Sequence, residues 1–457
     1  MEPRYICKDY RNLFSHFYSK KFVERTPCCS RLHFFGASDL DLDHLLGNAK
    51  QHSADYLGYS VIQPVRERCI GRTVVDPLRI GNSQDSFFCL RTLTTVHLNG
   101  AKYEVSGYPF FSQSGEATVC AHVALWGVCR YLSDRYPAYG EVYPYDIIQM
   151  TSSMSGRRVP YRGMTYSDYC EILSAFGCHP VALRMDTDQK SWTQDPQTFY
   201  DLYSYVESGF PVLASYGGHV VTIVGHTTQN HVGIHSKDTG QFYNSFSLVK
   251  QFIVVDDNFF PYRLLGYSSD PDNYGAVYKG TGLFTETPSI DSITTAVVPL
   301  PEKAFMPPDI ARRLAYNYFG HHSAQNLTTG LLEKLKIPPD EPLIARLFLT
   351  SGSQFKKRKR QSSAGGVGGV PDRLAMLPVD LRLPHFIWVM EISPLTLYNQ
   401  GLCFGEVLLD ASANEAESEY IYMRLGNTVF CGGEQSPCDD GLLQFVQYTH
   451  NLGERDA

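Results

Sequence analysis

The sequence predicts an α+β chain, and two observations lead to this fold class. Between about residues 115 and 210, apolar residues recur at three- to four-residue spacing, which is typical of helices. From there to about residue 285, short β-branched runs are separated by Gly, Asp and Asn, which is typical of strands. Helices followed by strands favour an α+β arrangement over alternating βαβ units.

The part before about residue 105 is predicted to be β-rich. It contains the strand-like runs YLGYSVIQPV and IGRTVVDPL, followed by a predicted hairpin in LRTLTTVHLNGAKYEVSGY. Asn99 and Gly100 supply the turn of this hairpin, because both tolerate the positive φ angles of a two-residue type I′ turn.

Three helices are predicted next. The first covers ATVCAHVALWGVCRYLSDRY and carries Cys120 in its first turn. The second lies in TYSDYCEILSAFG, where Thr165 and Asp168 form the start of a capping box and Gly177 ends the helix. The third covers TFYDLYSYVESG.

Strands are predicted after these helices, in FPVLASY, GGHVVTIVGH, VGIHS and LVKQFIVVDDN. The tail then reads as the helices PPDIARRLAYNYFG, TTGLLEKLKI and EPLIARLFLTS, followed by the strands HFIWVMEIS, GEVLLDAS and EYIYMRLG. The basic run from Lys356 to Arg360 and the Ser/Gly-rich segment after it predict a mobile loop near 351–370. Glu391 and Asp410, in the tail strands, are interpreted as charges at strand edges or turns.

We therefore expect three parts. These are a β-rich N-terminal region over 1–105, a central domain over 106–290 and an α+β C-terminal region over 291–457.

Composition narrows the class of protein. Of the 457 residues 43% are hydrophobic and 19% charged, as in folded globular chains. Forty Lys and Arg against 47 Asp and Glu give a net charge of −7, so no basic field favours nucleic acid as a partner. The start lacks an apolar signal segment, and no run approaches the ~18 apolar residues of a membrane span. We expect a cytoplasmic chain without membrane contact, whose oligomeric state the sequence does not reveal.

The 12 cysteines are expected to be reduced thiols, because the chain is long and has no export signal. None belongs to a CxxC pair, so no zinc ribbon is predicted.

One thiol, one imidazole and one carboxylate occur in settings that suit nucleophilic catalysis. Cys120 starts a predicted helix, where the peptide dipoles stabilise a thiolate. His219 follows two glycines and begins a strand, which would hold its ring rigidly as a base. Asp256 and Asp257 follow the next apolar strand, where a carboxylate would fix the histidine tautomer. Because successive strand residues point to opposite faces, we expect only one of the two to reach His219.

The other histidines fit this chemistry less well. His122 lies two residues after Cys120, a rotation of about 200° on a helix, so its ring should point away from the thiol. His226 lies seven residues after His219, so in a continuous strand it should face the other side of the sheet. His231 and His235 form an HxxxH, but Gly233 and β-branched neighbours argue against the helix that a zinc site needs. No metal or cofactor is therefore expected.

These motifs resemble the papain-like cysteine peptidase superfamily, and within it the peptidases that remove double-glycine leaders of bacteriocins. The resemblance rests on QSGEATVCAHVALW and on ESGFPVLASYGGHVVTIVGH followed by FIVVDDN, over about 110–260. It implies a papain-like domain over 106–290, with Cys120 as nucleophile, His219 as base and acid, and Asp256 as orienting carboxylate. It further implies Gln113 as oxyanion donor, although Gln113 precedes Cys120 by one residue more than is usual.

The function implied is hydrolysis of a peptide or isopeptide bond through a thioester acyl-enzyme. Two alternatives stay open. Transglutaminases and arylamine acetyltransferases use the same triad to pass an acyl group to an amine, and a papain-like fold can also be kept as an inactive binding module. The expected partner is a polypeptide substrate, and the aromatic and β content of the flanking regions suits binding it as an extended strand.

Overall fold

The computed structural model describes the chain except residues 37–52, 81–86, 151–162, 186–195, 233–241, 278–286, 364–372, 415–418, 427, 432–433, 438–441 and 445–457. Helices make up 35% and strands 34%, so the prediction of a chain that mixes both is confirmed. Among the described residues no helix combines the length and the apolar character needed to cross a bilayer.

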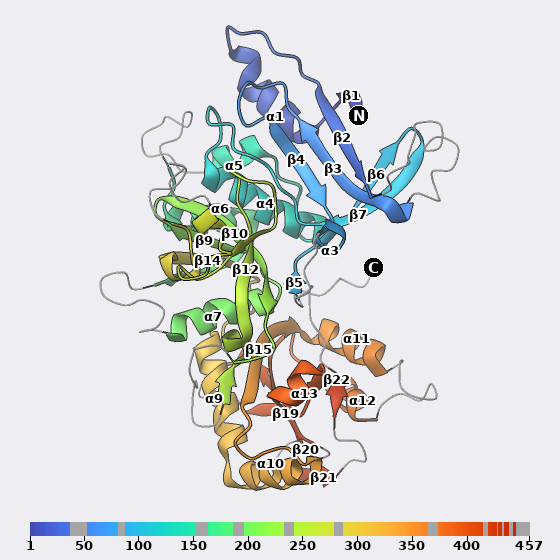
Figure 1. Ribbon diagram of the computed structural model, residues 1–457, viewed down its shortest axis with the longest axis vertical. Coiled ribbons are helices and arrows are strands. Elements are labelled where there is room, and N and C mark those ends of the chain that lie inside the picture. The colour runs from blue at the N-terminus through green and yellow to red at the C-terminus, as the bar shows by residue number, and fades with distance from the viewer. Residues whose placement is uncertain are drawn as a thin grey trace. The chain divides into compact units, whose positions relative to one another are not determined.

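The chain forms two compact units, and each is discontinuous in sequence (Figure 1). The first unit comprises Met1–Arg184, Pro211–His226 and Gln251–Pro299. The second comprises Met185–Phe210, Thr227–Lys250 and Leu300–Ala457.

The first unit begins with an antiparallel sheet in which β1 to β4 lie in sequence order. Its strands are β1 (Glu2–Tyr5), β2 (Cys29–Phe35), β3 (Tyr56–Ile62) and β4 (Ile70–Val75), and helix α3 (Pro77–Ile80) follows. The predicted hairpin is confirmed, with strands β6 (Thr92–Leu98) and β7 (Ala101–Gly107). Its turn has φ of 49° at Asn99 and 84° at Gly100, as a type I′ turn requires.

Helices α1 (Lys8–His16), α4 (Cys120–Arg135), α5 (Pro144–Met150) and α6 (Tyr166–Phe176) pack together in this unit. The predicted start and end of α6 are confirmed. The Thr165 side chain accepts from the Asp168 N–H, Asp168 accepts from the Thr165 N–H, and Gly177 ends the helix with φ of 103°. In α4 the buried Trp126 donates its indole N–H to Asp9 of α1 at 3.2 Å.

The second sheet of this unit has the strand order β13-β12-β10-β9-β14-β8, and β5 pairs with β10 beside this path. Its strands are β5 (Phe87–Cys89), β8 (His179–Arg184), β9 (Val212–Tyr216), β10 (His219–Thr228), β12 (Val249–Val255), β13 (Arg263–Leu265) and β14 (Thr295–Leu300). Helix α4 faces β10 and β12, because residues of all three line one pocket. Helix α8 (Tyr274–Val277) lies beside β13.

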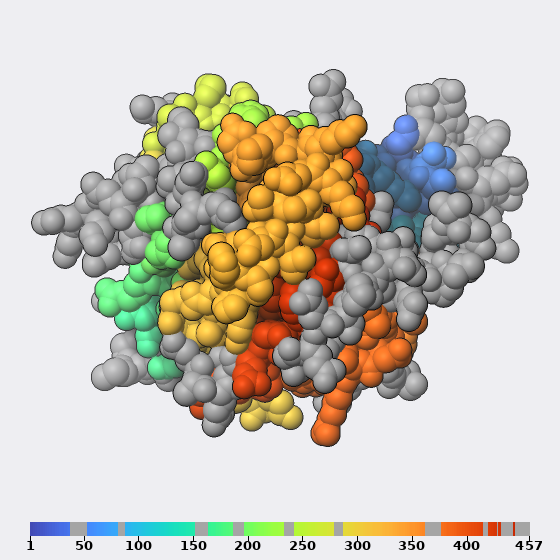
Figure 2. All heavy atoms as spheres, turned by 90° about the horizontal axis from the view of Figure 1, so that it is seen from below, coloured from blue at the N-terminus to red at the C-terminus, as the bar shows by residue number. Residues whose placement is uncertain are grey.

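The second unit is built on a sheet of order β11-β15-β16-β18-β19-β20-β21. Its strands are β11 (Phe242–Asn244), β15 (Leu343–Ser351), β16 (Phe386–Pro394), β18 (Gly405–Asp410), β19 (Tyr420–Leu425), β20 (Thr428–Cys431) and β21 (Glu434–Pro437), and β17 (Leu402–Cys403) pairs with β22 (Leu443–Gln444). The helices are α7 (Pro196–Glu207), α9 (Pro308–Gly320), α10 (His322–Leu335), α11 (Gly352–Ser363), α12 (Arg373–Asp380) and α13 (Leu395–Asn399). Seen from below, the surface of residues about 300–340, drawn in yellow to orange, borders the red surface of residues after about 400 (Figure 2).

Three predictions for the tail are wrong, and two of them concern secondary structure. The segment EPLIARLFLTS is not a helix, because it contains strand β15. Every residue of β15 is buried, so the strand lacks the alternation of a half-exposed strand, and its apolar run cannot be told from a buried helix. The basic run from Lys356 to Arg360 is not a mobile loop but part of α11, which buries Phe355 and Lys359. Residues 364–372 of that predicted loop, and most of the predicted strand VGIHS, lie outside the described residues.

Glu391 is also not an edge charge, because it lies in the central strand β16 and is 2% exposed. Arg346 of β15 donates to Glu391 at 2.7 Å and to Glu207 of α7 at 2.5 Å. Lys359 of α11 donates to Glu406 of β18 at 2.7 Å. These buried ion pairs therefore join β15 to β16 and to α7, and α11 to β18, in the core of the second unit.

Replacing Arg346 by Ala should lower the free energy of unfolding by about 3–5 kcal/mol, because it leaves two buried carboxylates without their partner. Denaturant unfolding of the full chain measures this loss. The control is Lys334→Ala at an exposed position of α10, which should cost no more than about 0.5 kcal/mol. Equal effects of the two substitutions would contradict the account.

Candidate active site

Cys120 is the first residue of α4 and is partly accessible. The loop before it is fixed by Ser114, whose hydroxyl accepts the backbone N–H groups of Ala117 at 2.8 Å and Thr118 at 3.1 Å. The Ser114 N–H in turn donates to the Thr118 hydroxyl at 3.0 Å. A rigid entry to the helix therefore fixes the position of the thiol.

His122 is a buried residue in the first turn of α4. Its Nδ1 accepts the Val119 N–H at 3.3 Å, so the ring occupies the helix start. Burial lowers the pKa of His122 to about 4, which keeps the ring neutral near pH 7.

His219 is held at the turn between β9 and β10. Gly217 and Gly218 form this turn with φ of 49° and 79°, a conformation that side chains with Cβ rarely adopt. His219 pairs in register with Tyr216, and the two rings lie 5.7 Å apart at 65°. The two-glycine turn and the ring contact therefore fix the imidazole at the end of the sheet.

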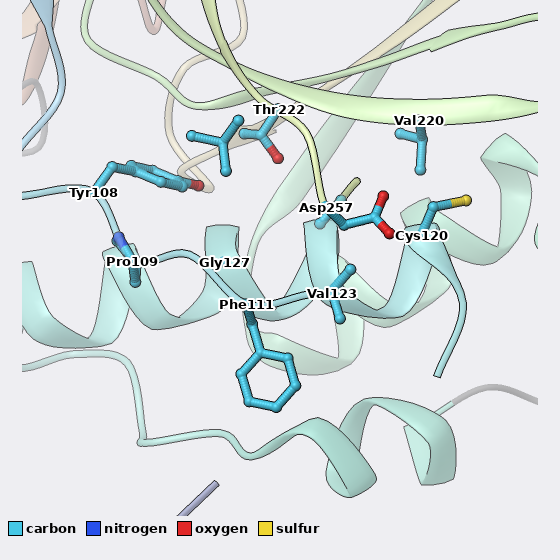
Figure 3. A pocket seen from close by; sticks show the side chains of 11 residues that line it. Tyr108, Pro109, Phe111, Cys120, Val123, Gly127, Val220, Thr222 and Asp257 are labelled. Carbon is cyan, nitrogen blue, oxygen red and sulfur yellow. The ribbon is translucent and has the colours of Figure 1, made fainter. Parts of the chain in front are cut away.

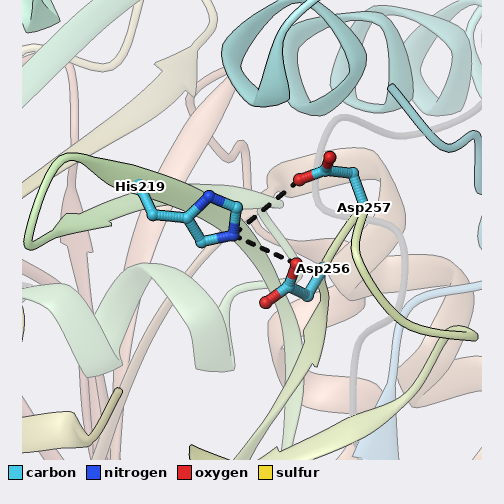
Figure 4. A group of neighbouring side chains, drawn as sticks. All are labelled: His219, Asp256 and Asp257. Carbon is cyan, nitrogen blue, oxygen red and sulfur yellow. Dashed lines mark hydrogen bonds and ion pairs between the residues drawn. The ribbon is translucent and has the colours of Figure 1, made fainter. Parts of the chain in front are cut away.

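The carboxylate of Asp256 lies 3.0 Å from Nε2 of His219 (Figure 4). Asp256 directly follows β12 and is fully buried. The same oxygen accepts the backbone N–H of Asn258 at 2.9 Å and its side-chain amide at 3.1 Å. Tyr274 of α8 donates to the other oxygen at 3.0 Å.

Tyr216 extends this chain of hydrogen bonds. Its hydroxyl lies 2.6 Å from that of Tyr274. Because Tyr274 gives its only proton to Asp256, Tyr216 is the donor in the pair. Burial, followed by the charge of Asp256, raises the pKa of Tyr274 well above its usual value, so it remains a donor.

These contacts determine the protonation states of Asp256 and His219. Burial alone would raise the pKa of Asp256, but the hydrogen bond and charge of His219, with the donors Asn258 and Tyr274, hold it below its usual value. Burial alone would lower the pKa of His219, but hydrogen bonds to Asp256 and to Cys120, and the charges of Asp256 and Asp257, raise it to about 10. The site therefore favours an imidazolium next to the thiol.

Of the two aspartates, only Asp256 forms a hydrogen bond with His219, but the expectation that Asp257 points to the opposite face is wrong. Asp257 Oδ1 lies 3.8 Å from Nε2 of His219, within ion-pair distance but beyond hydrogen-bond distance, whereas Asp256 lies at 3.0 Å. Strand β12 ends at Val255, and the alternation of side chains that governs a strand no longer holds at the two residues after it. Asp257 also lines a narrow pocket with Cys120 and Val123 of α4 (Figure 3).

Gln113 lies in the extended segment before the Ser114 turn and is half-buried. Its neighbour Ser112 is anchored to the backbone oxygens of Ile70 at 2.8 Å and Arg68 at 2.9 Å. Gln113 thus stands between two anchored residues, and its role as oxyanion donor stays a prediction.

Of the other histidines, His226 is buried, and its ring packs 5.7 Å from that of Phe88. His231 is described, whereas His235 lies outside the described residues.

Two groups of described residues bring possible metal ligands within 4.8 Å of one another. The first is His219, Asp256 and Asp257, where the donors around Asp256 favour a carboxylate held by hydrogen bonds. The second is Glu391, Cys403 and Glu406, which lies in the ion-pair network of the second unit, where three Glu face Arg346, Lys359 and Arg424. In this second group the opposite charges already balance, so no net negative charge is left there to attract a divalent cation.

Three residues of the hydrogen-bond network around Asp256 were not predicted from the sequence. Asn258 has a local signal, since an Asn two residues after an Asp suits a turn of this kind. Tyr216 and Tyr274 have none, because Tyr274 meets Asp256, and Tyr216 meets Tyr274, only through tertiary packing.

No protein-family model matches the chain, and no curated protein matches it either. The assignment of function therefore rests on the geometry of these residues.

Replacing Tyr274 by Phe should lower the free energy of unfolding by about 1.5–3 kcal/mol at pH 7, because it removes a donor to a buried ionised carboxylate. Denaturant unfolding measures the loss. The matched control is Tyr166→Phe at a position 40% exposed, with an expected change under about 0.5 kcal/mol. If both variants unfold at the same denaturant concentration, Asp256 is not held in the way described.

Proposed function

We propose that the chain is a cysteine peptidase of the papain-like type, which cleaves a peptide or isopeptide bond. One observation carries the proposal: His219 contacts Asp256 through Nε2 and interacts with Cys120 at the start of a helix. With Nε2 directed at the carboxylate, Nδ1 is the ring nitrogen left for the thiol. A thiolate and an imidazolium in this arrangement are a nucleophile and a proton donor held together.

In the proposed reaction the Cys120 thiolate attacks the carbonyl carbon and the C=O π electrons move to oxygen. The oxyanion is stabilised by the Cys120 N–H at the helix start and by the Gln113 side chain. His219 gives its proton to the leaving nitrogen as the C–N bond breaks, which leaves a thioester on Cys120. His219 then takes a proton from water, the hydroxide adds to the thioester, and the acid leaves with the thiolate restored.

Asp256 supports this cycle by keeping the ring in one orientation. Its oxygens accept hydrogen bonds from Asn258 and Tyr274, so it cannot turn away when the ring loses its proton. We take the hydrogen bonds that fix this carboxylate beside His219 as support for an active enzyme rather than an inactive binding module.

The test is digestion of a defined mixture of synthetic peptides by the full chain, with new termini read by mass spectrometry. Wild type should produce new termini and Cys120→Ala should produce none, while thermal unfolding shows both folded. The control is Cys170→Ala, which removes another partly accessible thiol and should keep wild-type activity. Cleavage that persists in Cys120→Ala would refute the proposal.

The same digestion with an added primary amine separates hydrolysis from acyl transfer. A peptidase should yield free carboxyl termini as its main products. Amide adducts as the main products would instead assign the chain to the acyltransferases.

A further inference from the structure

Asp257 is a buried carboxyl that no hydrogen bond satisfies. Its side chain is 4% exposed, and among the described residues neither of its oxygens has a hydrogen-bond partner. The adjacent Asp256, by contrast, accepts hydrogen bonds on both oxygens. A buried carboxylate without donors costs several kcal/mol, so its presence at this site needs a physical reason.

The groups that face Asp257 come from four parts of the first unit. His219 of β10 places Nε2 at 3.8 Å from Oδ1. Arg68, between β3 and β4, places a guanidinium nitrogen at 3.6 Å from Oδ2 and is 41% exposed. Asp256 precedes it in the chain, and Cys120 of α4 lines the same pocket (Figure 3). Both cations lie beyond the usual hydrogen-bond distance, so Asp257 interacts with them by charge.

Substrate binding does not explain this carboxyl. Both oxygens are buried, and the rest of the pocket is mostly apolar, including Val123, Val220 and Val255. A substrate cation would have to enter that apolar space. The nearest charge change in the proposed reaction is instead the gain and loss of a proton on His219.

We propose that Asp257 is a positioning residue that acts by charge: its carboxylate stabilises the His219 imidazolium beside Cys120. Asp256 orients the ring through hydrogen bonds, and Asp257 adds a second anion without competing for the same ring proton. The consequence for turnover rests on the proposed function, whereas the effect on His219 does not.

This role depends on pH. Burial, followed by the charge of Asp256, raises the pKa of Asp257 to about 7, while His219 and Arg68 oppose the shift. Below about pH 7 Asp257 is neutral and Asp256 alone supports the imidazolium. Above it both carboxylates are charged, and the imidazolium is held until the pH approaches the His219 pKa of about 10.

The test is an NMR titration of the ring Cε1–H of His219 in the full chain with labelled histidine, assigned by its loss in His219→Gln. Wild type should show a small step near pH 7 and a large step near pH 10. In Asp257→Asn the small step should vanish and the large step should move down by about one pH unit or more. The control Asp272→Asn, at an exposed position, should leave both steps in place.

A second variant tests the same charge effect without changing Asp257 itself, in case Asp257→Asn alters the local fold. Arg68→Gln alters a half-exposed side chain and removes a cation beside Asp257, so the small step should move to higher pH. A His219 titration that is unchanged in both variants would overturn the proposal. Because no substrate is used, an altered titration in a chain without peptidase activity would refute the proposed function and leave this inference intact.

Discussion

The contact between His219 and Asp256 is the interaction on which the candidate site depends. It joins a residue at the start of β10 to a residue just after β12, two neighbouring strands of one sheet. The two-glycine turn before His219 and the hydrogen bonds of Asn258 and Tyr274 to Asp256 leave each partner little freedom. A buried ion pair is stable only when its remaining hydrogen bonds are satisfied, and here the fold supplies them.

The two aspartates beside His219 have different surroundings. The donors around Asp256 and the charge of His219 hold the pKa of Asp256 below its usual value, whereas burial raises the pKa of Asp257, whose oxygens accept no hydrogen bond from another described residue, to about 7. Their different surroundings follow from the end of β12 at Val255, where the chain leaves the strand and brings both side chains toward one ring nitrogen. A small change of backbone geometry thus places two unlike carboxyl groups beside the same imidazole.

Local signals in the sequence were enough to predict several helices and strands of the first unit, which contains this site. Helix α6 with its Thr165 cap, the Asn99-Gly100 hairpin and the helix that starts at Cys120 all follow from short-range patterns. Tertiary contacts were not predictable in the same way. Strand β15 is buried on both faces and carries no alternation, and the basic helix α11 hides Lys359 against Glu406. The hydroxyl of Tyr274 meets Asp256, and that of Tyr216 meets Tyr274, only through the packing of the sheet with α8.

The central claim, that Cys120 and His219 form an activated pair, is tested most directly by thiol labelling. Limiting iodoacetamide at about pH 6.5, with peptide mapping, ranks the 12 cysteines of the folded chain by reactivity. Cys120 should react fastest in wild type and should lose this preference in His219→Ala. Labelling without preference, or a Cys120 that is as reactive in His219→Ala as in wild type, would contradict this claim.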